Sequence, residues 1–491
     1  MKLTNSTWTL TIMVLLGFMA TSCKSGSEGG GGVAPAPTSG PVPAPAPADE
    51  ELEAEVPALS ITPDFEQATA FNNGLVFATA SMAMNRQSPA AVLLDDGKVL
   101  VTGGKFSSAL FGTHYYAHSE IYSPGNENEF ESGSFRAAAH PMNSARMNHS
   151  MVKLNNGDVL VVGGTTGHGQ IGSAEYFDSV NETWTSIEGE CATTLSGALT
   201  VTLLQDGRVL ALGGHSKNAD IYDPNDGAFG CFAPTGELSI SRGYANAVLL
   251  DDGRVLVVGG YSGLVAEIYD PTTEMFSNVA DPLDTSRHGS TVTKVLTGKV
   301  LISGGDSVGN YTQSALLFDP STDTFSATGS PAFGRAYANA QLLTAGPQAG
   351  NVVLVGGFEN GGSSDGTKRI EVYNPTTESF IETATQSKYY RAYFAMVVLA
   401  DGARVLNLGG YRTGVNMTEI FSTKIAGSNY FHIEGGTAPY TLSVTQGDAR
   451  VSAANGAQVM LDSEVGSQSI TVQVTDADGT VANSEFEVVA E

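Results

Sequence analysis

The stretch Asp252-Gly253-Arg254-Val255-Leu256-Val257-Val258-Gly259-Gly260, followed by Ile268-Tyr269-Asp270-Pro271, contains the signals that decide the fold. Asp-Gly predicts a tight hairpin, because both residue types tolerate the positive backbone angles of such a turn. The apolar run after it is a strand, and the paired glycines remove side chains where backbones crowd. Asp-Pro predicts a second turn, in which proline presets the second position. The stretch therefore encodes most of one four-stranded antiparallel sheet.

The same unit recurs along the 491-residue chain. The seven glycine pairs, 45 to 60 residues apart, are Gly103-Gly104, Gly163-Gly164, Gly213-Gly214, Gly259-Gly260, Gly304-Gly305, Gly356-Gly357 and Gly409-Gly410. A unit repeated at this period predicts a β-propeller, with one sheet, or blade, for each repeat.

This pattern resembles the kelch repeat, which combines a glycine doublet, a Tyr-Asp-Pro-like turn and an aromatic residue some seven positions later. The aromatic pairs are Phe177 and Trp184, Tyr222 and Phe229, Tyr269 and Phe276, Phe318 and Phe325, Tyr373 and Phe380, and the wider Tyr122 and Phe130. The resemblance covers residues 71–425 and implies an all-β, seven-bladed kelch-type propeller. It implies little about function, because one fold hosts many activities.

The seventh unit has no aromatic-led fourth strand after Thr418-Glu419-Ile420-Phe421. Residues 76–82, before the first unit, resemble the fourth-strand segment at 324–329. We expect the N-terminal segment to complete the seventh blade, with Phe77 in the place of Trp184. No sheet edge is then left open.

Residues 1–22 resemble a bacterial lipoprotein signal peptide. Lys2 precedes an apolar stretch that is too short to span a membrane and ends in small residues. Ala20-Thr21-Ser22-Cys23 resembles the cleavage site, although that family usually has Leu, Val or Ile where Ala20 stands. We expect lipid attachment at Cys23, export, and anchoring to the bacterial cell envelope at the outer membrane. The alternative is a secretory leader with an unpaired cysteine.

Residues 23–60 combine four consecutive glycines, a Pro-Ala alternation and an acidic run, which cannot bury a core. They are interpreted as a tether or a plain spacer.

Residues 427–491 alternate apolar and polar residues around turn signals and resemble a small bacterial immunoglobulin-like β-sandwich. Asp476 and Asp478 there are typical of a hairpin turn, since the rest of a calcium loop is absent.

Cys191 and Cys231 fall near the ends of the predicted fourth strands of the second and third blades. In an exported protein they either form a disulfide or remain two buried thiols, and their spacing does not decide between these.

An arginine stands just before the first strand in six of the seven repeats, with Ser196 at that place in the third. These residues are Arg86, Arg146, Arg242, Arg287, Arg335 and Arg391. The start of the first strand shares an end of the blade with the loop after the glycines. One hypothesis is a positive ring that binds carboxylate or sulfate groups. The other is that the guanidinium groups only bond loop carbonyls.

Tyr244, Tyr337 and Tyr393 each follow an arginine by two positions, and Asn246 and Asn339 come two residues later. Polar and aromatic side chains near the mouth of a central channel form a reasonable binding surface. The loops after the glycines vary most in the first, second and sixth repeats, and those of the first two contain His114, His118 and His168. A metal site at His114 and His118 lacks a third ligand, so we expect neither a metal nor a cofactor.

The formal net charge of -27 argues against nucleic acids and anionic membranes as partners, so contact with a membrane is expected only through the lipid anchor.

The favoured function is an envelope-anchored module that binds a protein or an anionic glycan through the loop face. An exported propeller followed by an immunoglobulin-like domain is also similar to galactose-oxidase-type copper enzymes, but the chain contains no Tyr-His dipeptide, which that family's copper site requires. Periplasmic kelch-type sialic acid epimerases are a further enzymatic alternative, without a recurrent acid/base pair to support it. A purely architectural role is the third.

Overall fold

The structure is a computed structural model that describes residues 60–64, 75–108, 112–125, 133–214, 216–260, 264–307, 309–346, 348–360, 366–383, 385–411, 416–422, 427–434, 441–446, 449–452, 458–461, 468–475 and 477–488. The chain divides into two compact units, one formed mainly by residues 65–429 and one by both ends of the chain. No helix in these ranges is long and apolar enough to cross a membrane. The expected signal peptide, Cys23 and most of the tether lie outside the described residues.

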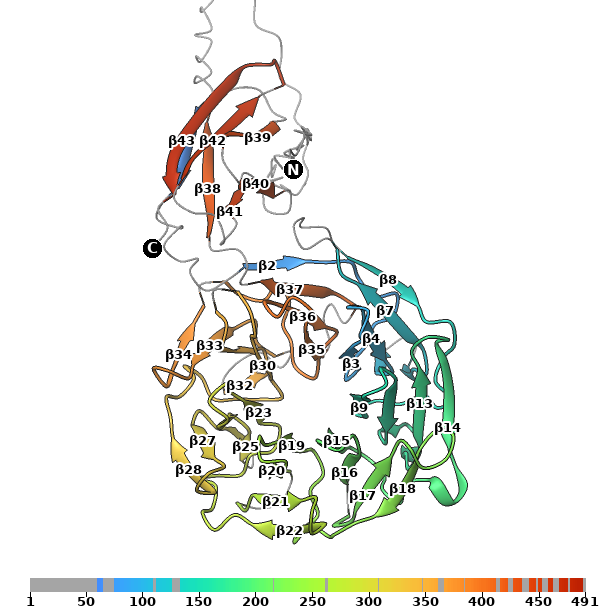
Figure 1. Cartoon of the computed structure of the whole chain (residues 1–491). Helices are drawn as coiled ribbons and strands as arrows, with labels where there is room; N and C mark the ends of the chain where they lie inside the picture. The colour runs from blue at the N-terminus through green and yellow to red at the C-terminus, as the bar shows by residue number, and fades with distance from the viewer. Residues whose placement is uncertain are drawn as a thin grey trace, which may run out of the picture. The chain divides into compact units, whose positions relative to one another are not determined.

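Seven four-stranded antiparallel sheets form the larger unit, and Figure 1 shows them arranged around a central axis. The strands of each blade are given from the axis outward. Blade 1 is β3 (Ala90–Leu93), β4 (Val99–Thr102), β7 (Ser119–Ser123) and β8 (Ser134–Ala137), and blade 2 is β9 (Ser150–Lys153), β10 (Val159–Val162), β13 (Ala174–Asp178) and β14 (Thr183–Ile187). Blade 3 is β15 (Leu199–Leu203), β16 (Val209–Gly213), β17 (Ala219–Asp223) and β18 (Cys231–Pro234). Blades 4 and 5 are β19 (Ala245–Leu249), β20 (Val255–Gly259), β21 (Glu267–Asp270) and β22 (Met275–Asn278); and β23 (Thr291–Lys294), β24 (Val300–Ser303), β27 (Ala315–Asp319) and β28 (Thr324–Ala327). Blade 6 is β30 (Asn339–Leu342), β31 (Val352–Val355), β33 (Ile370–Asn374) and β34 (Ser379–Glu382).

Blade 7 is assembled from both ends of the propeller. It contains β35 (Ala395–Val398), β36 (Arg404–Leu408), β37 (Thr418–Ser422) and, as its outermost strand, β2 (Leu75–Ala78). In the antiparallel pairing of β2 with β37, Val76 lies opposite Phe421. The prediction that the N-terminal segment completes this blade is therefore confirmed, over a shorter range than 76–82. The placement of Phe77 is wrong, because Val76 faces the third-strand aromatic as Trp184 does in blade 2, and Phe77 lies opposite Ile420.

The hydrophobic core lies between blades. One cluster combines Leu160 and Val162 of blade 2 with Val209, Ala211 and Tyr222 of blade 3. The cluster that joins the last blade to the first is built in the same way, from Leu406, Leu408 and Ile420 against Val99, Val101 and Tyr122. Since each blade buries both faces against its neighbours, the closed ring has no exposed apolar sheet face to cover.

The aromatic pairs of the third and fourth strands lie directly opposite each other, as expected, for Phe177 with Trp184, Tyr269 with Phe276, Phe318 with Phe325 and Tyr373 with Phe380. In blades 1 and 3 the aromatic that faces the third strand is not the one at the repeat spacing. Tyr222 faces Phe232 rather than Phe229, because the turn of blade 3 is longer and β18 begins only at Cys231. Tyr122 faces Phe135, and Phe130 lies outside the described residues.

The smaller unit contains two antiparallel sheets. One has the order β1 (Ser60–Asp64), β38 (Gly427–Glu434), β41 (Gln458–Leu461) and β40 (Ala449–Ser452), and the other consists of β39 (Thr441–Gln446), β42 (Gln468–Thr475) and β43 (Val481–Val488). β1 pairs with β38 from Ser60 opposite Glu434 to Asp64 opposite Tyr430. A segment N-terminal to the propeller thus belongs to the C-terminal sheets, so the tether interpretation is wrong at Ser60, the first residue of this strand.

Candidate functional site at the channel mouth

The six repeated arginines are buried, with at most 1% of each residue exposed. In every case Nη1 donates to the carbonyl oxygen of the first glycine of the pair in the same blade, as Arg146 does to Gly163 at 2.7 Å and Arg242 to Gly259 at 3.0 Å. Most also donate to the carbonyl just before the third strand, such as Ser173 and Ser314. Each guanidinium therefore holds the loop that follows the glycine pair.

A carboxylate neutralises each of these arginines. Five pair with a glutamate on the third strand of their own blade: Glu120, Glu175, Glu267, Glu371 and Glu419. Blade 5 has Leu316 on that strand, and Arg287 pairs instead with Asp284. The prediction of a positive mouth is wrong, because a desolvated guanidinium is stable only when its donors are bonded and its charge is paired. The bonded-carbonyl alternative describes all six residues.

The glycine pairs connect neighbouring blades. In four pairs the N–H of the second glycine donates to the carbonyl oxygen of the next blade's arginine, as in Gly104 to Arg146 at 2.8 Å and Gly357 to Arg391 at 2.7 Å. A Cβ on Gly259 would lie 2.6 Å from the Arg287 oxygen, closer than a side chain can come. Positive φ angles of 80° and 95° at Gly259 and Gly260 add a second reason for glycine. The structural interpretation of the doublets is confirmed.

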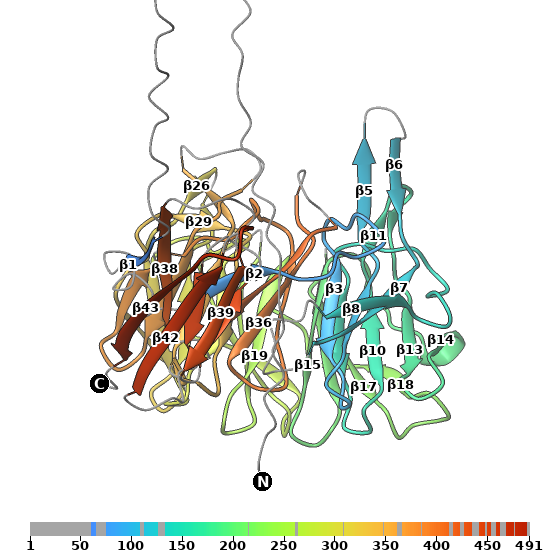
Figure 2. The same ribbon diagram turned by 90° about the horizontal axis from the view of Figure 1, so that it is seen from above.

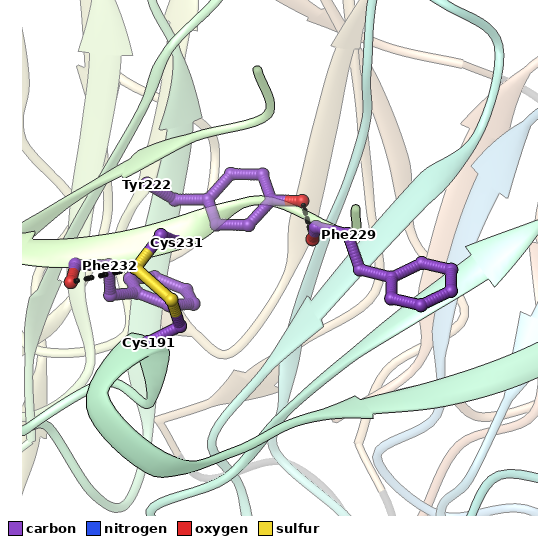
Figure 3. The surroundings of a disulfide bond; sticks show 5 residues. All are labelled: Cys191, Tyr222, Phe229, Cys231 and Phe232. Atoms are coloured by element: carbon purple, nitrogen blue, oxygen red, sulfur yellow. Dashed lines mark hydrogen bonds between the residues drawn. A yellow bond between two sulfur atoms is a disulfide. The ribbon is translucent and has the colours of Figure 1, made fainter. Parts of the chain in front are cut away.

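Blade 3, where Ser196 replaces the arginine, is held differently. Asp220 on β17 accepts bonds from the backbone and hydroxyl of Thr194 and from the hydroxyl of Thr193. A disulfide joins Cys191, in the short 3-10 helix η1 (Gly189–Cys191), to Cys231 on β18, so of the two alternatives for these cysteines the structure has the bridge (Figure 3). The disulfide therefore links the segment that leads into blade 3 to the outermost strand of that blade.

The residue two positions after each arginine has a left-handed backbone. The φ angles are 51° at Ser88, 51° at Asn148, 60° at Tyr244, 65° at Gly289, 58° at Tyr337 and 52° at Tyr393. Four backbone hydrogen bonds link these positions from blade to blade: Tyr337 N–H to Gly289, Tyr393 N–H to Tyr337, Ser88 N–H to Tyr393 and Asn148 N–H to Ser88. The conformation places these residues in one ring at the start of the innermost strands.

The tyrosines of this ring lean towards preceding blades. The Tyr337 ring covers Gly289, where a Cβ would lie 2.8 Å from two ring carbons, and its hydroxyl lies 3.1 Å from His288 Nδ1. Tyr393 packs on Tyr337 with ring centroids 4.5 Å apart. The Tyr244 hydroxyl reaches past blade 3 to Asn148, 3.3 Å away in blade 2. Together with Phe358 and Tyr411, these rings form an aromatic cluster across blades 4 to 7.

A cavity of about 280 Å³ lies inside this ring and is lined by residues of all seven blades. The lining residues are Ser88, Pro89, Asn148, His149, Ser150, Ala198, Leu199, Thr200, Tyr244, Ala245, Asn246, Gly289, Ser290, Tyr337, Ala338, Asn339, Tyr393 and Phe394. No Asp, Glu, Lys or Arg occurs among them. We call this cavity the axial pocket.

Two histidines at the axial pocket have lowered pKa values, which favour their neutral forms. Burial, with smaller contributions from Arg146 and Arg86, lowers the pKa of His149 to about 3, and its Nε2 lies 2.7 Å from the hydroxyl of Thr102. Burial also lowers the pKa of His288 below its ordinary value. The axial pocket is therefore an uncharged site of amides, hydroxyls and aromatic rings.

The expected loop features lie on the same side. β5 (Lys105–Ser108) and β6 (Gly112–Tyr115) form a hairpin that projects beyond the blades in Figure 2. His114 is exposed on β6, His118 precedes β7, and His168 is exposed in blade 2 between β11 (Thr165–Thr166) and β12 (Gly169–Gln170). Among the described residues no three His, Cys, Asp or Glu side chains are grouped so as to hold a metal ion.

Of the residues singled out from the sequence, the structure gathers the three tyrosines with Asn246 and Asn339 around the axial pocket and places the arginines beneath it. Sequence reasoning missed Ser88, Asn148, His149 and Gly289. The signal for the ring members was present, because each stands two residues after a repeated arginine.

Comparison with known proteins gives the repeat type and the fold. The Kelch motif family matches residues 146–188, which span the arginine, glycine pair and outer strand of blade 2. No curated protein matches the chain. A fungal alcohol oxidase of the AA5 family, solved in complex with copper, is structurally similar with a TM-score of 0.55 at 14% identity, over 85% of this chain and 100% of the oxidase. At that identity the likeness concerns the propeller fold alone.

Proposed function

We propose that the propeller is a non-catalytic binding module that takes its ligand at the axial pocket. The observation that carries this proposal is the left-handed backbone of Tyr244, Tyr337 and Tyr393. A non-glycine residue in this conformation costs about 1–3 kcal/mol, and such strain clusters at ligand sites. Gly289 shows that the ring position accepts glycine, so packing alone does not require three large strained aromatics there.

The alternative enzymatic functions have less support at this site. The copper ligands of an oxidase would have to include histidine and tyrosine, but His149 Nε2 and His288 Nδ1 lie against Thr102 and Tyr337, and the Tyr-His pair is absent from the sequence. The residues present therefore do not fit a copper site of that type. For an epimerase, the lining of the axial pocket lacks the carboxylates and lysines that usually move protons, and His149 is held neutral.

The test uses an array that carries glycans and peptides together, probed with the labelled protein. We expect array signals that are lost in Tyr393→Ala, because the ring forms part of the pocket wall, and retained in Leu296→Ser. Leu296 is 68% exposed and lies between β23 and β24, at the opposite end of those strands from the axial pocket. Signals that survive Tyr393→Ala, or a complete lack of signal, would contradict binding at this site.

We further propose, from the sequence, that the module is held at the bacterial outer membrane by a lipid on Cys23. The supporting features are the short apolar leader, the cysteine after small residues and the Gly/Pro-rich segment behind it. We also propose that the C-terminal sheets form an immunoglobulin-like domain, a proposal that the two antiparallel sheets support.

A further inference from the structure

The axial pocket has two chemically different halves. Blades 4 to 7 contribute the rings of Tyr244, Tyr337 and Tyr393, backed by the edge of His288 and by Phe358. Blades 1 to 3 contribute small or polar side chains, such as Ser88, Asn148 and Thr200. The asymmetry arises because the ring position is tyrosine in three of the four later blades and small or polar in the first two. A ligand with one apolar face and several polar groups would match both halves.

The asparagines of the axial pocket are oriented by their own hydrogen bonds. Asn246 Nδ2 donates to the carbonyl oxygen of Ser290 at 3.0 Å, and Asn339 Nδ2 donates to that of Phe394 at 2.8 Å. A carbonyl accepts only from the amide nitrogen, so these bonds fix which end of each carboxamide is the oxygen. Neither Oδ1 accepts a bond from the described part of the chain. Each half-buried asparagine therefore offers the pocket a hydrogen-bond acceptor.

These acceptors decide which ligands the axial pocket favours. Carbonyl oxygens and aromatic faces repel anions, and the arginines beneath already carry carboxylates. The volume of about 280 Å³ lies just below the usual range of ligand pockets and is too small for a folded peptide segment. Sugar hydroxyls donate to such acceptors, and the C–H face of a pyranose packs on aromatic rings.

We propose that the axial pocket binds one uncharged sugar residue of a glycan, with its apolar face on Tyr337 and Tyr393 and its hydroxyl groups donating to Asn246 and Asn339. The proposal rests on the binding role proposed above and names the ligand class for that site. It replaces the anionic glycan expected from the arginine pattern.

The experiment compares neutral glycans with their sulfated and sialylated counterparts on one array, followed by titration calorimetry with the strongest neutral glycan. We expect the neutral members to bind and the charged partners to bind at least about tenfold more weakly. Affinity should stay constant from about 0.05 M to about 0.5 M NaCl, because no ion pair forms. Tighter, salt-sensitive binding of the charged partners would overturn the proposal while leaving a binding role at the pocket intact.

Variants then locate the sugar. Asn246→Leu and Asn339→Leu should each weaken binding about fivefold, the loss of one hydrogen bond, and Tyr337→Ala about tenfold or more. Gly289→Ala should weaken it as well, because the new methyl group displaces the Tyr337 ring. Leu296→Ser is the control and should bind as the native chain does, and circular dichroism checks that each variant is folded.

The outcomes separate the two proposals. Neutral-glycan binding that all four variants leave unchanged places the sugar elsewhere and contradicts both. Pocket-dependent binding of peptides, with no glycan bound, contradicts only the sugar class. Binding to neither class contradicts both proposals.

Discussion

The backbone N–H of Gly410 donates a hydrogen bond to the carbonyl oxygen of Arg86, 3.1 Å away, and so joins the last blade to the first. Arg391 in blade 7 in turn holds the carbonyl of Gly409, beside Gly410. The same hydrogen-bond relay, in which an arginine donates to one glycine carbonyl and the next glycine N–H donates to the arginine carbonyl of the following blade, joins other neighbouring blades. The repeated residues therefore stabilise the ring rather than bind ligand.

Removing one buried arginine should test this role. Arg391→Leu leaves the Glu419 carboxylate buried without its cation and the Gly409 carbonyl without its donor. Breaking such a pair costs about 3–5 kcal/mol of unfolding free energy. Arg136→Leu is the matched control, since its pair with Glu182 is half exposed and should contribute no more than about 1 kcal/mol. Chemical denaturation measures both, and equal midpoints for the two variants would argue against the relay.

The closing strand should be required for cooperative unfolding. A chain that begins at residue 85 lacks β2 and exposes the edge of β37, whereas a chain that begins at residue 71 keeps the pairing of Val76 with Phe421. We expect a lower and broader thermal transition only in the shorter chain. Identical melting curves for the two chains would show that blade 7 is stable with three strands.

The disulfide should stabilise blade 3. It closes a loop with a sequence separation of 40, for which restriction of the unfolded chain predicts roughly 4 kcal/mol. Cys191→Ser with Cys231→Ser should lower the unfolding free energy by roughly 2–4 kcal/mol, and the native chain in reductant should match the variant. Thiol titration of the denatured, non-reduced chain without Cys23 should find none, and two free thiols would show that the bridge does not form.

His149 should make stability depend on pH. Its pKa is about 3 in the folded chain, against an ordinary value of 6.5, so below pH 6.5 the unfolded state binds more protons. Stability therefore falls as the pH decreases from 6.5 towards 3, by about 2 kcal/mol between about pH 7 and pH 5. Urea unfolding should show this loss in the exposed-loop control His168→Gln and a smaller loss in His149→Gln. Equal pH slopes in the two variants would contradict the assignment.

Lipid attachment should depend on Cys23 alone. Cys23→Ser should move the protein from the membrane fraction to the soluble fraction of the exporting cell and remove the mass of the acyl chains. Continued membrane association of the variant would exclude Cys23 as the anchor.

Much of the architecture could be predicted because it depends on short-range chemistry. The Asp-Gly and Asp-Pro turns, the apolar strand runs and the glycine doublets each specify their own few residues, and repetition then requires seven blades. The pairing of β1 with β38, far along the chain, could not be predicted, because Ser60 follows a segment of disordered composition. Phe229 lies at the repeat spacing of seven residues from Tyr222, but the longer turn before Cys231 places Phe232 opposite Tyr222 instead.

The sequence by itself determined that six arginines occupy one equivalent position and that three tyrosines follow them two residues later. Only the tertiary structure decided which of them face the channel. The direction of five of the six guanidinium groups depends on a glutamate some 25 to 36 residues away, and all six bond the first glycine carbonyl of their blade. The left-handed turn at the ring position then brings tyrosines of separate blades around one cavity. Residues of separate blades come together in this way only when the seven blades close into a ring, and no short sequence pattern encodes that closure.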